Sequence, residues 1–320
     1  MPHLELGDLR LHWREDGDAA GMPVVFLHAL GLDHSLWDDL VARLPQSYRL
    51  IRADLRGHGE SSCPPGPYAM GALIRDAERL LEHLGVRDCI LVGVSLGGMI
   101  AQGLAVKRLD LVRGLVLSNT AVKLGTAESW ARRIEEVRRL GLEGTAETVL
   151  ERWFPKRIRK GLDLSALRAK LVSTPLEGYL GCCRAIAGTD FYTPTAGLRL
   201  PVLVIAGSED GSTPPDLVRE TAELIPGAEF QMIRGAGHLP MIDATAHYAE
   251  LIGGFLARVG QSPRVEADEA EVEGGVHHHH HHGHLHQGDH FGCGDGSEAK
   301  AASGHCGGAS GHQACGCGGH

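Results

Sequence analysis

Short apolar runs of strand length recur along the chain, and longer stretches with helical spacing separate several of them. The runs lie at residues 24–27, 50–51 with their flanks, 90–94, 115–117 and 202–206. Each run is apolar at successive positions, as expected for strands buried on both faces of a mostly parallel sheet. Residues 70–84 and 99–106 have helical spacing. This alternation predicts a doubly wound α/β fold, to which residues 4–13 add an antiparallel hairpin that turns at Gly7-Asp8.

The alternation is interrupted between residues 123 and 198. The three helix-like stretches in this region cover residues 126–140, 145–154 and 164–171, with no strand-like run among them. Strands and helices resume at Pro201 and end with a predicted helix over residues 244–259. Ligands of such folds bind beyond the carboxyl ends of the strands. We therefore expect this helical insertion to form a lid over that edge.

Composition changes abruptly after Gly260, which divides the chain into a predicted globular domain of residues 1–260 and a tail. The tail, residues 261–320, is rich in Glu, Gly, His and Cys and has few large apolar residues, so we expect it to be disordered. It holds eight acidic and two basic residues, and accounts for most of the formal net charge of −9. The globular part has no basic excess that would favour nucleic acid as a partner.

The first ten residues include Glu5, Asp8 and Arg10, and lack the basic start and apolar run of a secretory signal. Residues 89–106 are long enough for a membrane span, but Gln102 and several glycines interrupt them. A buried strand followed by a helix explains this stretch better. We therefore expect a cytoplasmic protein without a membrane partner, in which the body cysteines are reduced.

A serine turn follows the predicted strand at residues 90–94. Gly93-Val94-Ser95-Leu96-Gly97 joins this strand to the next predicted helix, which is the context of a nucleophile elbow. Small residues two places before and after Ser95 let such a turn close. The hydroxyl is then exposed at the amino end of a helix.

A serine hydroxyl becomes a good nucleophile only when a base, itself oriented by a carboxylate, takes its proton. Asp210 stands just past the strand at residues 202–206, and His238 follows the strand-like residues 229–233. The order serine, aspartate, histidine is typical of this strand-turn-helix nucleophile. We therefore predict that Ser95, Asp210 and His238 form a catalytic triad.

Competing assignments are weaker. Glu209 is the main alternative to Asp210 as the acid of the triad. Successive side chains of a strand point to opposite faces, so the side chain of Glu209 is expected to point away from Ser95. The place after the preceding strand holds Ser118-Asn119-Thr120, which has no carboxylate. His83 and His247 fall in predicted helices, where a surface or packing role is expected.

An oxyanion hole requires two backbone N–H groups directed at the developing charge. One is expected from Leu96, the residue after the nucleophile. The other is expected from the loop after residues 24–27, at Leu30 with Ala29 as the alternative. His28 and His58 are expected to brace loops.

With these residues in place, residues 1–260 resemble the α/β-hydrolase superfamily, and within it the 3-oxoadipate enol-lactonases. The narrower resemblance rests mainly on the helical insertion. Its motifs are Asn119 to Thr126 with Trp130 and Arg133-Ile134, Leu150 to Phe154, and Glu177-Gly178-Tyr179 with Cys182-Cys183; Gly66-Pro67-Tyr68 and Thr213-Pro214-Pro215 add to it. Two segments do not resemble the enol-lactonases but are typical of α/β hydrolases in general, namely His28-Ala29 and Leu239-Pro240-Met241.

The resemblance implies a small-molecule lactone as substrate, opened to 3-oxoadipate in the β-ketoadipate pathway of aromatic catabolism. It implies no cofactor for catalysis, and a substrate site that includes Trp130, Arg133 and Trp153. Arg133 is the candidate partner of a substrate carboxylate, because it lies one helical turn after Trp130.

Other functions stay open at this stage. The alternatives are another carboxylesterase or a carbon–carbon bond hydrolase with the same triad, and a protein that binds or stores metal through its tail. Imidazoles and thiols are good ligands for nickel and zinc ions. The six consecutive candidate ligands in the tail are His277, His278, His279, His280, His281 and His282.

Overall fold

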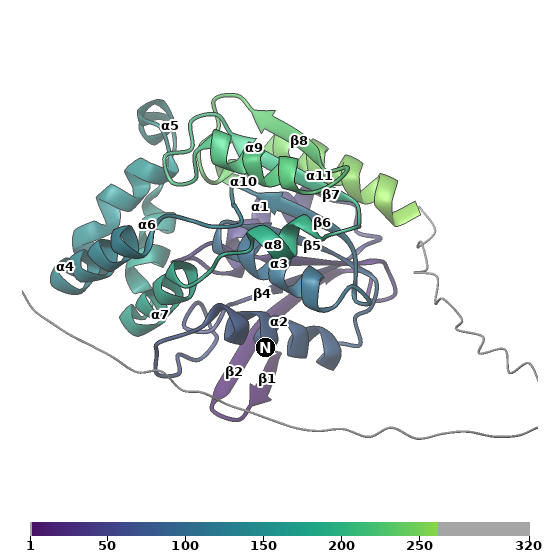
Figure 1. The fold of residues 1–320 in the computed structure, drawn as a ribbon, viewed down its shortest axis with the longest axis horizontal. Helices are drawn as coiled ribbons and strands as arrows, with labels where there is room; N and C mark the ends of the chain where they lie inside the picture. The colour runs from purple at the N-terminus through teal and green to yellow at the C-terminus, as the bar shows by residue number, and fades with distance from the viewer. Residues whose placement is uncertain (1, 262–320) are drawn as a thin grey trace, which may run out of the picture. The chain divides into compact units, whose positions relative to one another are not determined.

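The computed structural model describes residues 2–261, and its centre is one eight-stranded sheet (Figure 1). The strand order is β1-β2-β4-β3-β5-β6-β7-β8, and all neighbours from β4 to β8 run parallel. The strands are β1 (His3–Leu6), β2 (Leu9–Gly17), β3 (Pro23–Leu27), β4 (Arg49–Ala53), β5 (Cys89–Val94), β6 (Val112–Ser118), β7 (Val202–Gly207) and β8 (Glu229–Ile233). The predicted doubly wound α/β fold is confirmed.

Helices cover both faces of the sheet. On one face α2 and α3 pack together and are followed by α8 and α9; on the other, α1, α10 and α11 contact one another. Their bounds are α1 (Asp38–Arg43), preceded by a 3₁₀ turn η1 (His34–Trp37), α2 (Met70–His83), α3 (Leu96–Lys107), α9 (Pro215–Leu224), α10 (Pro240–Asp243) and α11 (Thr245–Gln261). The buried side chains of α2 recur at three- and four-residue steps, which explains why this segment is a helix with one face on the core.

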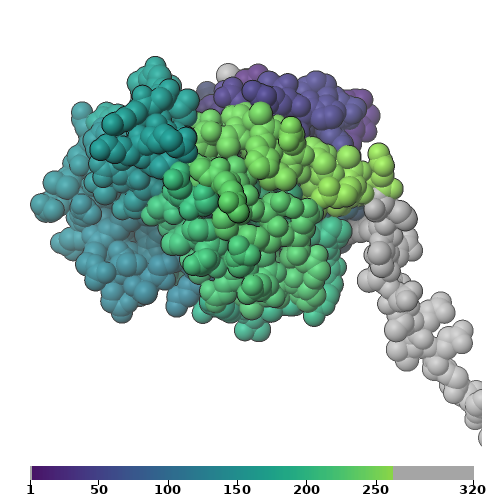
Figure 2. Space-filling view, turned by 90° about the horizontal axis from the view of Figure 1, so that it is seen from above, coloured from purple at the N-terminus to yellow at the C-terminus, as the bar shows by residue number. Residues whose placement is uncertain are grey.

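The helical insertion between β6 and β7 contains no strand. Its helices α4 to α7 gather on one side of the body, whereas α8 lies beside α3 (Figures 1 and 2). Its helices are α4 (Ala127–Trp153), α5 (Lys156–Gly161), α6 (Ser165–Ser173), α7 (Leu176–Ala187) and α8 (Tyr192–Ala196). The two helices predicted at residues 126–140 and 145–154 are confirmed as the two halves of α4, which meet at a kink where Gly141 has φ +70°. The helices α5, α7 and α8 were not predicted.

The backbone of the insertion lies directly against the backbone of the loop after β4 at one place. A Cβ atom on Gly57 would lie 2.5 Å from the Cα of Gly178 in α7, and one on Gly178 would lie 2.3 Å from the Gly57 carbonyl oxygen. Only two glycines permit this approach. The start of α7 is thereby held directly against the body.

The hairpin and the last helix differ slightly from the prediction. Strand β2 continues to Gly17 and pairs antiparallel with β4, so the hairpin joins the main sheet. Helix α11 ends at Gln261, two residues beyond the end predicted for this helix. The predicted disordered tail otherwise lies outside the described residues. None of the helices in residues 2–261 is long and apolar enough to cross a membrane.

Candidate active site

Ser95 stands at the turn between β5 and α3 in a strained backbone conformation. Its φ is +54° and its ψ is −116°, a region that few residues other than glycine adopt. The turn is held from the loop after β6, because the Ser95 N–H donates to the Ser118 carbonyl (3.0 Å) and the Thr120 hydroxyl donates to the Ser95 carbonyl (2.7 Å). This strain, fixed by the surrounding structure, is common at functional sites.

The glycines on either side of Ser95 are required by close packing. A Cβ atom on Gly93 would lie 2.3 Å from the Gly97 carbonyl oxygen, and one on Gly97 would lie 2.0 Å from the Leu27 carbonyl oxygen. The second contact brings the start of α3 against the end of β3. The loop expected to supply half of the oxyanion hole begins there.

Asp210 and His238 are joined by a buried hydrogen bond. The His238 Nδ1 lies 2.9 Å from Oδ2 of Asp210, and both residues are buried. Since a carboxylate accepts, Nδ1 carries the proton, and Nε2 is left with a free electron pair. The other carboxylate oxygen accepts the backbone N–H groups of Ser212 and Thr213, each at 2.8 Å.

Asn119 completes this arrangement, a role that was not predicted for it from the sequence. Its side-chain amide donates to Oδ2 of Asp210 and to the Gly237 carbonyl, each at 3.1 Å. Its neighbours Ser118 and Thr120 bind the Ser95 backbone. One loop therefore links the serine turn to the aspartate and to the histidine loop. The position of Asn119, directly after β6 at the edge where Ser95 and Asp210 lie, is the signal that could have identified it.

The loop after β3 is braced by two neutral histidines. His28 Nδ1 binds the Ala29 carbonyl (2.8 Å) and its Nε2 accepts the Leu55 N–H (3.0 Å). His58 Nε2 accepts the Gly31 N–H (3.0 Å). Burial lowers the pKa of both rings, that of His58 to about 3. The predicted bracing role of these histidines is confirmed, and Ala29 and Leu30 are held between them.

The carboxyl end of α4 is bonded to the loops that carry Asp210 and His238. The Gly211 N–H donates to the Arg152 carbonyl (3.0 Å), and the His238 N–H donates to the Trp153 carbonyl (2.7 Å). The Trp153 side chain is buried. The helical insertion thus reaches the predicted triad through its backbone.

Trp130 and Arg133 share one face of α4, as expected from their spacing. The Arg133 guanidinium lies over the Trp130 ring, 4.8 Å from its centroid, and donates to the Tyr179 hydroxyl at 2.9 Å. The Trp130 N–H is occupied by the Leu124 carbonyl (2.7 Å). The ring therefore orients the guanidinium by stacking.

The rival residues lie elsewhere. The Glu209 carboxylate is 3.4 Å from the Arg157 guanidinium on the protein surface. His247 is exposed on α11, and the ring of His83 packs edge-on against Trp13. None of the three contacts Asp210 or His238 through a hydrogen bond of the described residues.

Comparison with known proteins gives the family. A sequence model described as the alpha/beta hydrolase fold matches residues 22–245. The chain belongs to the α/β-hydrolase family. This α/β hydrolase is therefore an enzyme of the hydrolytic class, as predicted.

Its relatives narrow the resemblance. The hydrolase is 36% identical over 208 residues to 3-oxoadipate enol-lactonase 2 of Acinetobacter baylyi, covering 64% of this chain and 78% of the relative. It is 30% identical over 238 residues to 3-oxoadipate enol-lactonase 1 of the same organism, covering 74% and 89%. The crystal structure of the enol-lactonase from Burkholderia xenovorans LB400 superposes with a TM-score of 0.77 at 33% identity, covering 80% of this chain and 100% of that one. The resemblance to enol-lactonases is confirmed, whereas neither carbon–carbon bond hydrolysis nor metal storage is supported by these relatives.

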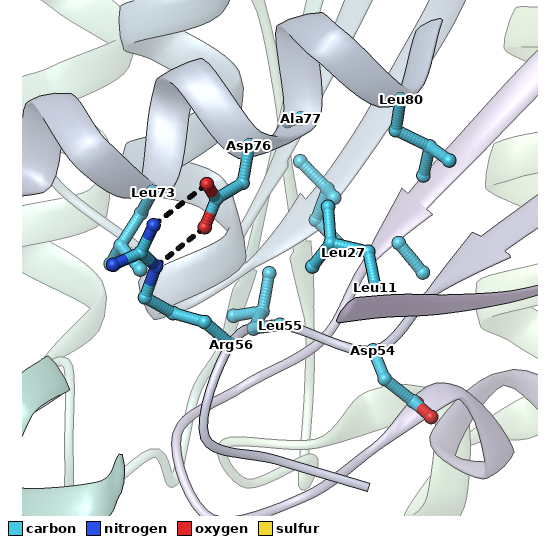
Figure 3. A pocket seen from close by; sticks show the side chains of 10 residues that line it. Leu11, Leu27, Asp54, Leu55, Arg56, Leu73, Asp76, Ala77 and Leu80 are labelled. Atoms are coloured by element: carbon cyan, nitrogen blue, oxygen red, sulfur yellow. Dashed lines mark hydrogen bonds and ion pairs between the residues drawn. The ribbon is translucent and has the colours of Figure 1, made fainter. Parts of the chain in front are cut away.

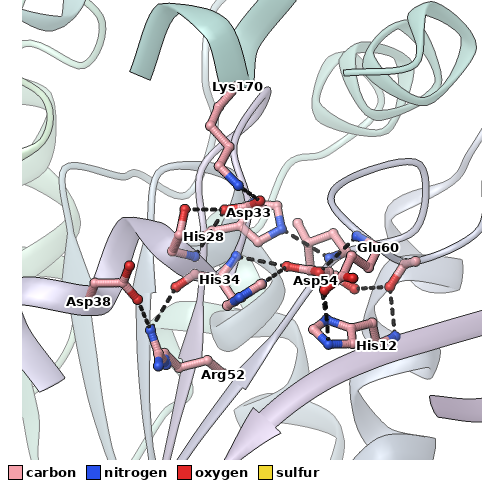
Figure 4. A network of polar contacts seen from close by, with 12 residues as sticks. His12, His28, Asp33, His34, Asp38, Arg52, Asp54, Glu60 and Lys170 are labelled. Carbon is pink, nitrogen blue, oxygen red and sulfur yellow. Dashed lines mark hydrogen bonds and ion pairs between the residues drawn. The ribbon is translucent and has the colours of Figure 1, made fainter. Parts of the chain in front are cut away.

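Next to the braced loop, the hydrolase contains a buried network centred on Asp54 (Figure 4). Its two carboxylate oxygens accept from the ring Nδ1 of His12 and of His34, each at 2.8 Å. Burial alone would raise the pKa of Asp54, but the hydrogen bonds from His34 and from the Glu60 N–H, together with the neighbouring histidines, outweigh burial and hold this pKa well below its usual range. His12, His34 and Asp54 offer possible metal-ligand atoms within 4.8 Å of one another. Because both Nδ1 atoms already bond the carboxylate, the cluster acts as a brace.

The hydrolase also has a small cavity beside Asp54, closed on one side by the ion pair between Arg56 and Asp76 (Figure 3). Its volume is about 10 Å³, so it is too small for an organic substrate. Ser95, Asp210 and His238 are not among its lining residues.

Proposed function

We propose that Ser95, Asp210 and His238 form a catalytic triad that opens an enol-lactone. The observation that carries this proposal is the buried bond between His238 Nδ1 and Asp210, next to the strained Ser95 turn in a chain similar to enol-lactonases. The acid and the base are oriented for proton transfer at Nε2. Residues 1–261 act as the catalytic unit, with the helical insertion as its lid.

In the first step, His238 Nε2 takes the proton of the Ser95 hydroxyl while Oγ attacks the lactone carbonyl. The N–H groups of Leu96 and Leu30, with Ala29 as the alternative to Leu30, stabilise the oxyanion. Collapse breaks the ring C–O bond and releases an enolate, which is more stable than an alkoxide. The enolate takes the proton from His238 and tautomerises to the ketone.

In the second step, His238 takes a proton from water as the water oxygen attacks the acyl carbon. The bond from this carbon to Ser95 breaks, and the proton returns to the serine oxygen. The product is an open-chain keto acid with a new carboxylate. The chemistry draws on no group outside the chain and the water.

The substrate that we propose is 3-oxoadipate enol-lactone, and the pathway is β-ketoadipate catabolism of aromatic compounds. The support is the printed activity of the relatives from Acinetobacter baylyi and Burkholderia xenovorans. Trp130, Arg133 and Trp153 are the proposed substrate-binding residues, because the α4 segment that carries them is bonded to the loops of Asp210 and His238.

Two experiments test this proposal: labelling with a phosphonate that reacts with nucleophilic serines, and kinetic measurements on substituted variants. Ser95→Ala and His238→Ala are expected to lower kcat for lactone opening by about three orders of magnitude or more, because triad members act as a unit. The exposed Ser47→Ala is the matched control, with unchanged kcat. Phosphonate should label the peptide that contains Ser95. Near-normal turnover by folded Ser95→Ala would overturn the proposal.

We also propose that the tail binds nickel or zinc ions through His277 to His282, independently of catalysis. This prediction lies outside the described residues, and its support is the histidine-rich sequence alone.

A further inference from the structure

The loop between β3 and η1 carries the N–H groups proposed for one half of the oxyanion hole. Ala29 and Leu30 are both buried, and within residues 2–261 neither backbone N–H donates to an acceptor. An N–H group stabilises a developing oxyanion well only if its direction is fixed before the reaction begins. The contacts that orient this loop therefore bear directly on the proposed chemistry.

The body of the hydrolase holds this loop at two places. His58 accepts the Gly31 N–H, and Asp54 accepts the backbone N–H of His34 at 2.8 Å. Between these two contacts Gly31 has φ +82° and no side chain, so its backbone can rotate unless its neighbours hold it. The Gly31 carbonyl is bonded from the helical insertion instead.

Helix α6 of the insertion supplies two polar contacts to the loop. The hydroxyl of Thr174, the residue that caps α6, lies 3.2 Å from the Gly31 carbonyl oxygen and 2.9 Å from that of Lys170, so two acceptors share its proton. Lys170 Nζ lies 2.6 Å from Oδ2 of Asp33 (Figure 4). Because Lys170 and Thr174 are four positions apart, both lie on the side of α6 that faces the loop.

Apolar side chains of the insertion close the open face of Gly31. A Cβ atom on Gly31 would lie 2.6 Å from Cδ1 of Leu171 and 3.1 Å from Cε2 of Tyr179, and both of these side chains are buried. The backbone at Gly31 thus lies between His58 of the body and helices α6 and α7 of the insertion.

The ion pair with Lys170 fixes a buried charge. The side chain of Asp33 is 7% exposed, whereas that of Lys170 is 45% exposed. Burial alone would raise the pKa of Asp33, but hydrogen bonds from Lys170 and Ser35 hold this pKa below its usual value. A buried carboxylate that loses one partner is left with uncompensated charge, so Asp33 is expected to move when Lys170 is removed.

We propose that α6 positions the oxyanion hole: Thr174 and Lys170 hold residues 31–33 so that the preceding N–H points at the substrate carbonyl oxygen. Both are positioning residues, which act through the loop. The proposal rests on the proposed function and extends it, because it makes the lid part of the catalytic apparatus. The hole is complete only while α6 lies against this loop.

Two substitutions test the proposal. Thr174→Val removes the hydroxyl with little change of shape, and Lys170→Met removes the charge with little change of length. Each should lower kcat for the enol-lactone by about tenfold with KM nearly unchanged, because the N–H of the hole remains but is less well directed. Lys170→Arg keeps a cation for Asp33 and should retain most of kcat. Melting curves identify the variants that are folded.

The matched controls remove similar groups elsewhere in the insertion. Thr189→Val removes a buried hydroxyl that bonds the Ala185 carbonyl of the preceding helix α7 (2.6 Å). Arg168→Met removes an ion pair between α6 and Glu147 of α4 (2.9 Å). Both should leave kcat unchanged. Losses of kcat as large as those of the two test variants would assign the effect to a general loosening of the insertion and overturn the proposal.

A pair of ketones measures the oxyanion hole without the lactone. The Ser95 oxygen adds to the carbonyl carbon of butyl trifluoromethyl ketone while His238 takes the serine proton, and the carbonyl oxygen becomes an oxyanion. Butyl methyl ketone binds without forming this adduct. In Thr174→Val and Lys170→Met, the inhibition constant of the trifluoromethyl ketone should rise by about tenfold, and that of the methyl ketone should not change.

The outcomes separate this proposal from the function on which it rests. If Ser95→Ala binds the trifluoromethyl ketone as tightly as the wild type, the proposed nucleophile is overturned, and the positioning role with it. If adduct formation depends on Ser95, Thr174 and Lys170 but the enol-lactone is not opened, the proposed substrate fails and the positioning role stands. If the lactone is opened, and kcat and both inhibition constants are unchanged in folded Thr174→Val and Lys170→Met, the positioning role is overturned.

Discussion

Individual side chains around Asp210 are arranged to hold its carboxylate in one orientation. Two backbone N–H groups bind one oxygen, and Asn119 and His238 bind the other. A carboxylate with these donors has few alternative positions. The orientation of the His238 ring follows from that of the carboxylate.

Asn119→Ala removes one of these donors and also the bond to the Gly237 carbonyl. We expect kcat to fall by about tenfold, the worth of roughly one hydrogen bond, with a small change in KM, because the substrate site is untouched. Steady-state kinetics and a melting curve measure the two effects. An unchanged kcat in the folded variant would contradict a positioning role for Asn119.

Asp243 makes stability depend on pH. It accepts the Gly237 N–H at 2.8 Å, and burial raises its pKa from 3.8 to about 6. Between these two values the native protein holds a proton that the unfolded chain has lost, so this group makes stability decrease as the pH rises through that window. Asp243→Asn keeps an acceptor for Gly237 but has no charge. Its Tm should exceed that of the wild type at pH 8, and the difference should vanish near pH 4.

The exposed Glu250→Gln on α11 is the control for this charge removal and should leave the pH dependence of Tm unchanged. If the Tm changes between pH 4 and pH 6 in the same way in Asp243→Asn as in the wild type, the dependence belongs to other groups.

At the scale of elements, the helical insertion is connected to the body at separate places. Its α4 end is bonded to the loops of Asp210 and His238, α6 carries Lys170 in an ion pair with Asp33 (2.6 Å), and α7 meets Gly57. Figure 4 shows Lys170 reaching from α6 to the loop after β3. The insertion therefore contacts the loops of the proposed base, the proposed acid and the predicted oxyanion hole.

Gly237→Ala tests the connection at α4. The new Cβ would lie 2.2 Å from the Trp153 carbonyl oxygen, so the end of α4 or the His238 loop must move. We expect a loss of stability of about 1–3 kcal/mol, as for other overpacked sites, together with a lower kcat.

Gly253→Ala is the matched control, because its Cβ would meet nothing within 4 Å in the middle of α11. It should stabilise the protein by up to about 1 kcal/mol through helix propensity, with unchanged kcat. Equal effects of the two substitutions would show that the contact with Trp153 has no special role. Denaturant titration and kinetics measure both.

The elements that the sequence predicted are those with a strong apolar period. The parallel strands and α2 are in this class, because they bury their side chains against a large sheet. The helices α5, α7 and α8 are short or apolar around most of their surface, as in α7, where eight of twelve residues are buried. In such helices the apolar residues do not recur on one face only, so the sequence shows no helical period. The kink at Gly141, by contrast, falls in the gap between the two helices predicted at residues 126–140 and 145–154.

The part of the candidate site that could be predicted is the part that depends on the order of strands along the chain. Ser95, Asp210 and His238 each follow a strand of one parallel sheet, so topology alone places them at one edge. Asn119 contacts Asp210 although the two residues are 91 positions apart in the sequence. Such contacts leave no mark in the spacing of residues.

For the whole molecule, we predict that catalysis and metal binding separate at the end of α11. The chain should be cut after Gln261, because Arg113 donates to the Gly260 carbonyl and a shorter cut would remove part of this helix. The truncated protein should keep its kcat and Tm, and should lose nickel binding in calorimetry. A truncated protein that binds as much nickel as the full chain, or that folds but no longer opens the lactone, would contradict this separation.

The glycine pair at positions 57 and 178 has a consequence for evolution by recombination. Because the two backbones touch, no side chain at either position can adapt to a new neighbour. A chimaera that received the insertion of another hydrolase would collide with Gly57 unless the donor also had glycine at the position of Gly178. Lid exchange in this lineage is thereby limited to donors that share this pair, while substitutions along α4 remain open to selection for new substrates.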